Sequence, residues 1–449
     1  MNAASPGPAD VKVSVPMITY NHERFIAQAI EGVLMQQTDF GVELVIGEDC
    51  STDGTRAIVR HYGERYPERI RLLLPERNRG GLANAVATFN ACRGQYIAPC
   101  EGDDYWTDPL KLQKQVGFLE AHPDYVLCHH DAIIVDENGA LLRDSKLPPD
   151  SRRDFSGEEL IKGALVLTLT ACYRHVVTEY PPEHFRVFNS DTFLFSLLGN
   201  YGRSKYLGDT IQPDAYRVHS GGIWSSQAND WLRAYHLLST YYWLRVYYQR
   251  LGKKEYARYF SHALLHANVL YRLPSADQVE STLVVHLERV EGQLSALNDT
   301  PERNASMRAC LSANLYVGGA LASFGWQCWE RGRYYLEQAV QLDPDAWSDG
   351  ASLESILVNQ GAALAESSGG IDGTRLHNYL IGIRHHFPKK LQLPEQIYRR
   401  VESRIYAEAA YRCHLATDRR GVRHYTRHAL QSNPLLVKDI GMLRRAIRL

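Results

Sequence analysis

The chain lacks the cysteine patterns that stabilise small or metal-bound modules. Its eight cysteines are scattered along 449 residues, and no two of them form a Cys-x-x-Cys pair. We therefore expect neither a zinc module nor a disulfide framework, and the pattern suits the reducing environment of the cytoplasm.

The chain also lacks an excess of charge of either sign. Its 50 lysines and arginines stand against 51 aspartates and glutamates, which gives a formal net charge of -1. A protein that binds nucleic acid through its overall charge would be strongly basic, so we expect no nucleic-acid partner.

Long apolar runs are missing as well. No stretch approaches the ~18 uninterrupted apolar residues of a membrane-spanning helix. The N-terminus shows no basic segment followed by an apolar one, as a signal peptide would. These absences predict a cytoplasmic location.

What the chain does have is length. At 449 residues, of which 45% are apolar, it is too long for a single core and can bury two or more. We predict a disordered N-terminus over residues 1–10, an α/β domain over residues 11–228 and a helical domain over residues 229–449.

Strand and helix patterns alternate through the first half. Short or alternating apolar runs predict strands, and apolar residues at helical spacing predict the helices between them. Asn21 is expected to cap the first helix. Such alternation predicts right-handed crossovers and a mainly parallel sheet, so the fold class is α/β. The expected order is strand 11–19, helix 22–34, strand 43–46, helix 55–62, strand 70–74, helix 81–92 and strand 96–98.

Helical spacing replaces this alternation from about residue 229 onward. Three expected helix ends carry a proline, at positions 344, 388 and 434, and the intervals between them are 44 and 46 residues. This resembles tetratricopeptide-like helical hairpins, although the period is longer than the ~34 residues of that repeat. We expect stacked helix pairs that support self-association or the docking of a protein partner. The residues at helical spacing include Trp231, Tyr235, Leu238, Tyr242 and Val246.

Three carboxylates lie close together directly after the strand at 96–98, on Glu101, Asp103 and Asp104. Acidic groups this close repel one another, so a fold keeps them together only beside a cation or a partner rich in hydrogen-bond donors. The carboxyl end of a parallel strand is also where open α/β sheets bind ligands. The cluster therefore predicts a site for a divalent cation and a diphosphate; the alternative is a solvated acidic turn.

Taken together, the motifs of the first half resemble the inverting family 2 glycosyltransferases of GT-A fold. An ordered set of motifs is more specific than any one of them. The resemblance implies a GT-A type sheet, a nucleotide diphosphate sugar as donor and a Mg2+ or Mn2+ ion as cofactor. The matching segments, within about residues 11–225, are VSVPMITYNHERFIAQAIEGVLMQQ, VIGEDCSTDGT, NRGGLANAVATFNACRGQYIAPCEGDDYW, NSDTFLFSLL and YRVHSGG.

The resemblance assigns residues on the donor side of the site. Tyr20 matches the position whose ring stacks on the nucleobase, and Asp49 matches the acceptor of a hydrogen bond from a pyrimidine imide, which implies a uridine or thymidine diphosphate sugar. Asp103 matches the carboxylate that contacts the ribose, and Asp104 matches the one that binds the metal ion. Glu101 stands where the family often has an aspartate, so its contact with the nucleotide is not carried over. Without the resemblance, Tyr20 is a packing residue at the helix entry and Asp49 is a turn carboxylate.

The resemblance also assigns the catalytic base. Asp191 matches the carboxylate that takes the proton of the acceptor hydroxyl on the face opposite the leaving group. Its alternative role is to cap the helix that follows. His219 and Arg217 lie on a glycine-containing loop of the kind that closes over the diphosphate in this family. His219 is therefore a candidate metal ligand, or else a polar loop residue, and Arg217 is a candidate diphosphate ligand.

His129 and His130 look metal-binding by composition, but they lie in a strand pattern. Adjacent strand residues point to opposite faces, so the two imidazoles cannot share one ion without a bulge. We expect both to be structural.

The resemblance says less about the acceptor. Residues 168–174 fall where the family places acceptor-side residues, and the Gln-x-x-Arg-Trp motif of processive membrane synthases is absent after Asp191. The implied enzyme is non-processive and adds one sugar to a saccharide or lipid-linked saccharide, in surface polysaccharide or glycoconjugate synthesis. Such an acceptor is compatible with a cytoplasmic protein or with peripheral association at the inner membrane.

Two other functions compete with this interpretation. The first is a catalytically silent adaptor whose helical repeats bind a partner, but an adaptor has no need to retain Asp49, Asp103, Asp104 and Asp191 together. The second is a nucleotidyltransferase, which would usually show a glycine-rich phosphate loop near the first strand. The segment MITYNHERF contains no such loop.

Overall fold

The computed structural model contains two compact units, Met1–His236 and Leu237–Leu449. The predicted N-terminal tail of residues 1–10 lies outside the described residues, and the predicted boundary at 228/229 falls at the edge of another such stretch. The residues that the structure describes are 11–187, 189–222, 230–266, 275–296, 301–343, 357–358, 366–367, 370–387, 395–415 and 418–432.

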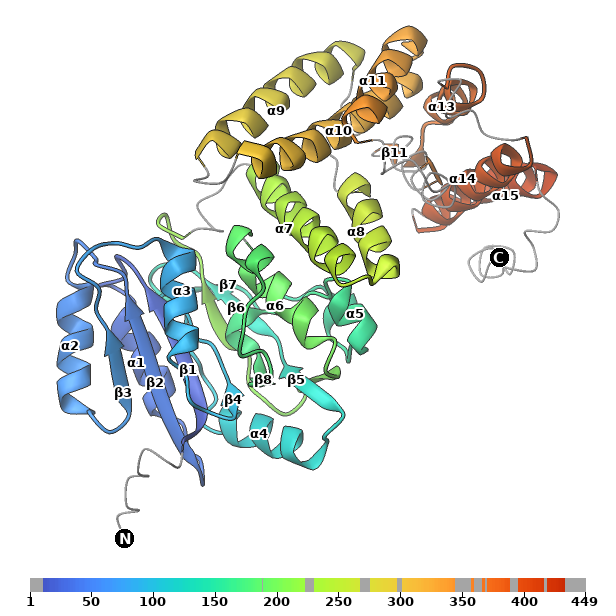
Figure 1. Ribbon diagram of the computed structural model, residues 1–449. Helices are drawn as coiled ribbons and strands as arrows, with labels where there is room; N and C mark the ends of the chain where they lie inside the picture. Colours follow the sequence, from blue (N-terminus) through green and yellow to red (C-terminus); the bar gives the residue numbers. More distant parts are fainter. Residues whose placement is uncertain are drawn as a thin grey trace. The chain divides into compact units, whose positions relative to one another are not determined.

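A seven-stranded sheet forms the centre of the first unit (Figure 1). Neighbouring strands pair in parallel except at β8, which is antiparallel to both β4 and β5. The predicted α/β class with a mainly parallel sheet is therefore confirmed. In sheet order the strands are β3 (Ile70–Leu73), β2 (Gly41–Glu48), β1 (Val11–Thr19), β4 (Tyr96–Ile97), β8 (Cys172–Arg174), β5 (Tyr125–His129) and β9 (Arg203–Tyr206).

Apolar side chains of the sheet and its helices form one large core. Val13, Val15 and Met17 on β1 are fully buried, as the alternation of the sequence predicts. They pack with apolar residues of three helices, α1 (Ile26–Leu34), α2 (Thr55–Arg65) and α4 (Lys111–Ala121). Helix α3 (Gly81–Asn90) instead approaches β2 at Gly47, whose carbonyl accepts a hydrogen bond from Asn84 Nδ2 at 2.7 Å.

The prediction that Asn21 caps the first helix was wrong. Asn21 adopts a left-handed backbone conformation with φ of 55°, and α1 begins only at Ile26, with Phe25 at its N-cap. Asparagine tolerates this conformation better than most residues, because its short polar side chain can bond locally. Instead, the Asn21 side chain joins the loop after β1 to the loop after β2, because its Oδ1 accepts the backbone N–H of Thr52 at 2.8 Å.

The first unit also contains a second sheet of three strands, and one of these strands pairs with the residue that follows the acidic cluster. Its order is β10 (Asp214–Arg217), β6 (Ala132–Val135) and β7 (Leu141–Arg143). Ala215 of β10 exchanges two backbone hydrogen bonds with Tyr105, at 2.9 and 3.2 Å. The remaining elements are α5 (Gly157–Ile161), α6 (Ser190–Leu198) and three short 3₁₀ helices at Pro149–Ser151, Thr168–Thr170 and Pro182–Arg186.

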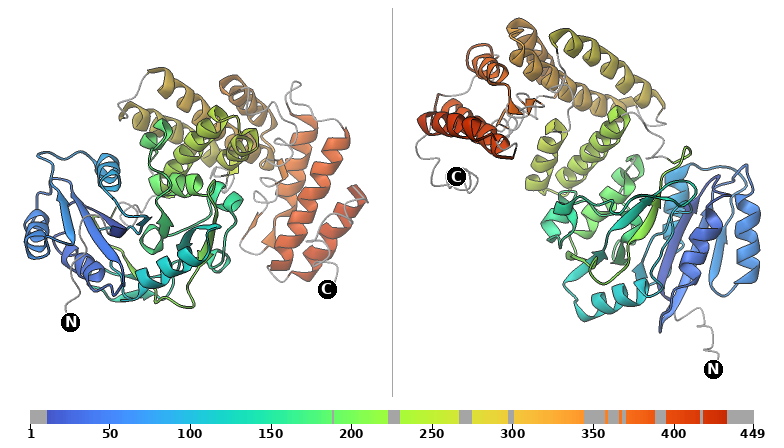
Figure 2. Two further views of the ribbon diagram at one scale, coloured as in Figure 1. Left: turned by 60° about the horizontal axis from the view of Figure 1, so that its bottom comes forward. Right: turned by 180° about the vertical axis from the view of Figure 1, so that it is seen from behind.

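The second unit is helical, as predicted. Helices α14 and α15 lie side by side, and α10 packs against α9, α11 and α13 (Figures 1 and 2). The three prolines of the expected repeat fall on residues that the structure does not describe. Helix α7 (Asp230–Arg250) begins in the first unit and continues into the second. The other described elements of the second unit are α8 (Lys254–His266), α9 (Ala276–Ala296), α10 (Pro301–Gly325), α11 (Trp329–Leu342), β11 (Glu366–Ser367), β12 (Gly370–Ile371), α13 (Gly373–His385), α14 (Glu395–Leu415) and α15 (Arg419–Ser432).

Glycine permits the close packing around α10. A Cβ on Gly332 or Gly382 would lie 2.4 or 2.5 Å from the ring of Phe324, which is fully buried. Larger residues would therefore push α11 and α13 away from α10. Among the described helices, none is long and apolar enough to cross a membrane.

A buried ion pair ties α4 to β10 in the first unit. Lys111 Nζ lies 2.6 Å from Asp214 Oδ2, donates to the carbonyl of Leu169 and lies 4.0 Å from the ring centroid of Trp106. His130 Nε2 lies 3.2 Å from the same Asp214 oxygen. Neither Lys111 nor Asp214 is exposed to solvent.

We predict that Lys111→Met destabilises the first unit by about 3–5 kcal/mol, because it leaves Asp214 buried without its lysine. Lys114→Met is the matched control, since Lys114 is one helical turn away and pairs with Asp108 from a position that is 33% exposed. That control should cost about 1 kcal/mol or less. Urea denaturation of both variants checks the difference, and equal losses would show that burial of the pair does not matter.

Acid should weaken this unit through His129. Burial, with a contribution from the charge of His130, lowers the pKa of His129 to about 3. Below about pH 6.5 the unfolded chain binds a proton that the folded chain does not, so stability falls by about 1.4 kcal/mol per pH unit until the folded pKa is reached. His129→Phe, whose ring can stack on Phe155 as His129 does, should flatten the loss measured between pH 6.5 and pH 4.5. An unchanged slope would mean that other groups account for the acid sensitivity.

Candidate active site

Loops that follow β1, β2 and β4 meet at the carboxyl edge of the sheet. The loops after β1 and β2 are joined by reciprocal hydrogen bonds. The backbone N–H groups of Asn21, His22 and Glu23 donate to side-chain oxygens of Ser51, Thr55 and Asp53, at 2.9, 2.8 and 3.1 Å. In return, Gly54 N–H donates to Glu23 Oε2 at 2.6 Å. This pairing fixes where Tyr20 and His22 stand.

Asp49 holds a third loop in place. It is 2% exposed, and its two carboxylate oxygens accept the backbone N–H groups of Arg79 and Gly80 at 2.8 and 2.9 Å. Its carbonyl accepts from Asn78 Nδ2 at 3.0 Å. Asp49 therefore holds the loop that leads into α3. Its predicted hydrogen bond to a nucleobase would use a lone pair of the carboxylate that is not engaged by this loop. Tyr20, 42% exposed, stands at the same edge, where its predicted stacking role stays a prediction.

The acidic cluster continues the sheet beyond β4. Backbone N–H groups of Ala98, Cys100 and Gly102 donate to β1 carbonyls at 3.1, 3.1 and 3.0 Å. A Cβ on Gly102 would lie 2.7 Å from the side chain of Thr19, so this approach of the cluster to the end of β1 requires glycine. The spacing Glu-Gly-Asp-Asp is therefore set by packing as well as by charge.

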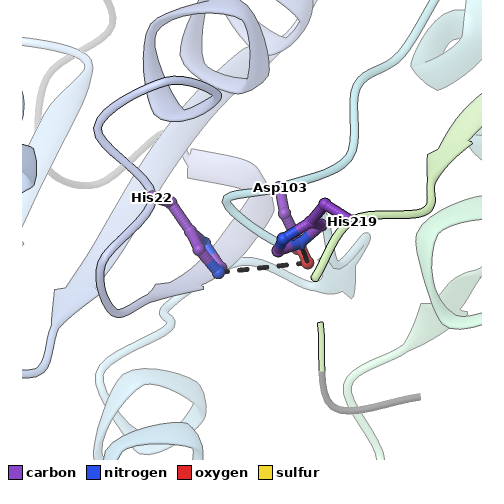
Figure 3. A group of neighbouring side chains, drawn as sticks. All are labelled: His22, Asp103 and His219. Atoms are coloured by element: carbon purple, nitrogen blue, oxygen red, sulfur yellow. Dashed lines mark hydrogen bonds and ion pairs between the residues drawn. The ribbon is translucent and has the colours of Figure 1, made fainter. Parts of the chain in front are cut away.

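Asp103 faces two imidazoles. His219 Nε2 lies 3.1 Å from Asp103 Oδ2, and His22 Nε2 lies 3.9 Å from the same oxygen (Figure 3). Burial raises the pKa of Asp103, but the hydrogen bond from His219 and the electrostatic interactions with both imidazoles outweigh burial, so the pKa lies below its ordinary value. Burial is the main cause that lowers the pKa of His22. His22 is thus favoured as a neutral imidazole near pH 7.

Asp104 turns toward the protein. Its Oδ1 accepts the backbone N–H of Arg217 at 2.8 Å, and it is 3% exposed. Burial, followed by the charges of Asp103 and Glu101, raises its pKa well above the ordinary value. The crowding of carboxylates that the sequence indicates is therefore present, and the donors that relieve it come from Arg217 and His219.

The guanidinium of Arg217 bonds to the protein itself. Its Nε donates to the carbonyl of Asp103 at 2.9 Å, its Nη2 to Gln28 Oε1 at 2.7 Å, and its Nη1 to two carbonyls of the turn after β6 at 3.3 Å. Arg217 is 4% exposed. These contacts give it a role in holding the loops around Asp103, while its predicted contact with a diphosphate stays a prediction.

Asp191 is bonded but does not occupy the cap position. Helix α6 begins at Ser190 with Asn189 at its N-cap, so Asp191 is the second helical residue. Its Oδ2 accepts from Thr168 Oγ1 at 3.0 Å, and its Oδ1 accepts the backbone N–H of Thr192 at 2.6 Å. The capping alternative therefore does not explain the residue by itself.

Glu101 links Asp191 to the acidic cluster. Burial, together with the negative charges of Asp103 and Asp191, raises the pKa of Glu101 to about 8. Near neutral pH this carboxyl group is mostly protonated, which reduces repulsion within the cluster. Asp103 and the candidate base Asp191 thus both act electrostatically on Glu101.

His129 and His130 have separate environments. The His129 ring stacks on Phe155 with centroids 5.5 Å apart, whereas His130 faces Asp214 through Nε2 and the carbonyl of Asp131 through Nδ1. Both are fully buried. This arrangement agrees with the expected structural roles.

Residues 14–174 match the family model described as glycosyl transferase family 2. An uncharacterised glycosyltransferase of Nostoc, alr2836, is 29% identical over 227 residues, which cover 49% of this chain and 68% of that protein. Residues 14–174 are therefore similar to glycosyl transferase family 2.

Other relatives extend this picture. The uncharacterised protein Rv1520 of Mycobacterium tuberculosis is 40% identical over 219 residues, covering 49% of this chain and 62% of that protein. The chain thus spans less than two thirds of that relative's length. The poly(ribitol-phosphate) beta-N-acetylglucosaminyltransferase TarS of Staphylococcus aureus is 26% identical over 209 residues, covering 44% of this chain and 34% of TarS. A crystal structure of TarS residues 1–349 with UDP-GlcNAc covers 82% of this chain and is itself covered to 89%, with a TM-score of 0.43 and 16% identity.

The sequence did not predict the contacts of two residues at this candidate site. His22 stands two positions after Tyr20 in the matched segment TYNHE, but its approach to Asp103 depends on the pairing of two loops. Thr168 lies in the acceptor-side segment, and nothing in its spacing indicated a hydrogen bond to Asp191. Both contacts join residues more than 20 positions apart.

Proposed function

We propose that the protein is a metal-dependent, inverting and non-processive glycosyltransferase. It would move one sugar from a UDP- or dTDP-linked donor to a hydroxyl of a saccharide or lipid-linked saccharide acceptor. The observation that supports the proposal most is the Asp191 carboxylate, which accepts hydrogen bonds from Thr168 and from the Thr192 N–H and acts electrostatically on Glu101 of the acidic cluster. The similarity of residues 14–174 to glycosyl transferase family 2 supports the reaction class.

The donor side is supported by chemistry at the sheet edge. The resemblance gives the metal to Asp104 and the ribose to Asp103, but we propose that Asp103 and His219 hold the divalent cation, because an oxygen and a nitrogen donor converge there and the crowded carboxylates favour a cation. When bound, such a cation would neutralise charge that develops on the departing diphosphate. Tyr20 would stack on the base, and Asp49 would accept from the imide of a uracil or thymine.

The acceptor side depends on Asp191. Its carboxylate would take the proton of the acceptor hydroxyl as that oxygen attacks the anomeric carbon and the bond to the diphosphate breaks. The electron pair of the broken bond leaves with the diphosphate, so a single displacement inverts the anomeric centre. Thr168 would keep one carboxylate oxygen oriented, which makes it a positioning residue.

The helical unit has a separate part in the proposal. The candidate carboxylates all lie in the first unit, so the second unit would serve self-association or the docking of a partner. The name of TarS, which includes a poly(ribitol-phosphate) acceptor, supports a polymeric acceptor in polysaccharide synthesis.

Asp191→Asn tests the reaction. The amide keeps the size of the carboxylate and can still accept from Thr168, but it cannot take a proton. We predict that release of UDP from a UDP-sugar panel, with water as acceptor and Mn2+ present, falls about 10²–10⁴-fold. UDP affinity and melting temperature should stay within error of wild type.

Two controls sharpen this result. Asp209→Asn, on the turn after β9, should change nothing, and proton NMR of the released sugar should show inverted anomeric configuration. Turnover by Asp191→Asn at the wild-type rate would remove Asp191 as the base. Absence of both UDP binding and turnover in wild type would favour the silent adaptor.

A further inference from the structure

Three side chains from distant parts of the sequence offer ligand atoms at one point. His22 follows β1, Asp103 follows β4 and His219 follows β10 (Figure 3). One ligand atom from each lies within 4.8 Å of the others. Divalent transition ions bind such nitrogen and oxygen donors at about 2.0–2.2 Å, so a small inward movement of the side chains would bring all three onto one ion.

The imidazole of His22 forms no hydrogen bond with the described residues. Among the described residues, its buried Nδ1 has no hydrogen-bond partner, and its Nε2 lies 3.9 Å from Asp103 Oδ2, beyond hydrogen-bond distance. Buried polar atoms are nearly always bonded, so an unpartnered imidazole beside a carboxylate and a second imidazole indicates a ligand.

The ring of His22 is nevertheless well positioned. Its backbone N–H donates to Thr55 Oγ1 at 2.8 Å. Its ring packs in a T-shaped arrangement with the ring of His219, with centroids 5.8 Å apart, and is tilted against the ring of Phe25, with centroids 6.3 Å apart. Packing against these rings thus orients the imidazole of His22 toward Asp103, although no hydrogen bond joins the two side chains.

We infer that His22 is a protein ligand of the divalent cation, together with Asp103 and His219. This inference rests on the proposed metal-dependent function and goes beyond it by naming a third ligand and a preference among ions. Asp104 is less suited to the same ion, because one of its oxygens already accepts from the Arg217 N–H at 2.8 Å.

The ligand set determines which ion is preferred. Two imidazoles and one carboxylate suit Mn2+ and later transition ions, whereas Mg2+ prefers oxygen ligands and retains its water. With three protein ligands, the site should bind Mn2+ before any nucleotide arrives. A site with a single carboxylate would depend on the diphosphate to complete it.

Mn2+ binding to the untagged full-length chain tests this inference without reference to turnover. Titration followed by electron paramagnetic resonance gives the affinity, and electron spin-echo modulation counts the nitrogen atoms bound to the ion. We expect one Mn2+ with two imidazole nitrogens in the absence of nucleotide. His22→Gln should lose one of them and weaken Mn2+ binding about tenfold or more, since even changes behind a ligand cost 10–100-fold.

Matched variants separate His22 from general effects. His61→Gln makes the same change at an exposed position on α2 and should leave Mn2+ affinity unchanged. His219→Gln should lose the other nitrogen, and Asp104→Asn should keep both. Melting temperatures of all variants check that each is folded.

The outcomes distinguish this inference from the proposed function. Wild-type Mn2+ affinity and two bound nitrogens in folded His22→Gln would overturn the role of His22, while a transferase using Asp103 and His219 would stand. Loss of a nitrogen in His22→Gln, in a protein that binds no UDP-sugar, would support the metal site and contradict the transferase. If wild type binds no Mn2+ without nucleotide, the three-ligand site is wrong.

Discussion

The arrangement of the first unit depends on one electrostatic constraint, the crowding of three carboxylates directly after β4, of which Asp104 is buried and Glu101 and Asp103 are half-buried. Burial and mutual repulsion raise the pKa values of Glu101 and Asp104, and the cluster therefore needs donors or a cation nearby. The protein supplies donors from β10, where the Arg217 N–H bonds Asp104 and His219 bonds Asp103. The position of β10 thus decides whether the cluster can exist.

Other buried groups hold β10 in that position. The Lys111–Asp214 pair joins its first residue to α4, and the exchange between Tyr105 and Ala215 joins its second residue to the cluster itself. The Arg217 guanidinium then binds carbonyls on both sides of the strand's end. A site built on distant segments is rigid only if each is fixed in this way, and these contacts leave Asp103 as the carboxylate that faces His22 and His219.

Much of the first unit could be predicted from sequence, because its signals are local. Alternation in residues 11–19 and helical spacing in the next segment indicated the parallel sheet, and the Glu-Gly-Asp-Asp spacing located the cluster. The assignments of Asp103 and Asp191 came from the family resemblance rather than from periodicity. The prediction for Asn21 failed because an asparagine caps a helix only if the helix begins at the next residue. In the structure the Asn21 side chain accepts the backbone N–H of Thr52, and α1 begins only at Ile26.

The remaining features depend on contacts that no local pattern records. Nothing in the local sequence indicates the role of Lys111, because its partner Asp214 stands 103 positions away and the pair is fully buried. The resemblance predicts that Asp49 accepts a hydrogen bond from a nucleobase, but in the structure its carboxylate also accepts hydrogen bonds from the loop before α3. His22 became a candidate ligand only once the loops after β1, β4 and β10 were brought together.

The central claim is that this edge of the sheet binds a uridine nucleotide through a metal ion. Calorimetric titration of UDP and GDP into the full-length protein, with Mn2+ and again with excess EDTA, tests it most directly. The account predicts that UDP binds more tightly than GDP when Mn2+ is present and that EDTA removes most of the UDP affinity. Equal affinity for the two nucleotides, or UDP binding that EDTA does not weaken, would contradict it.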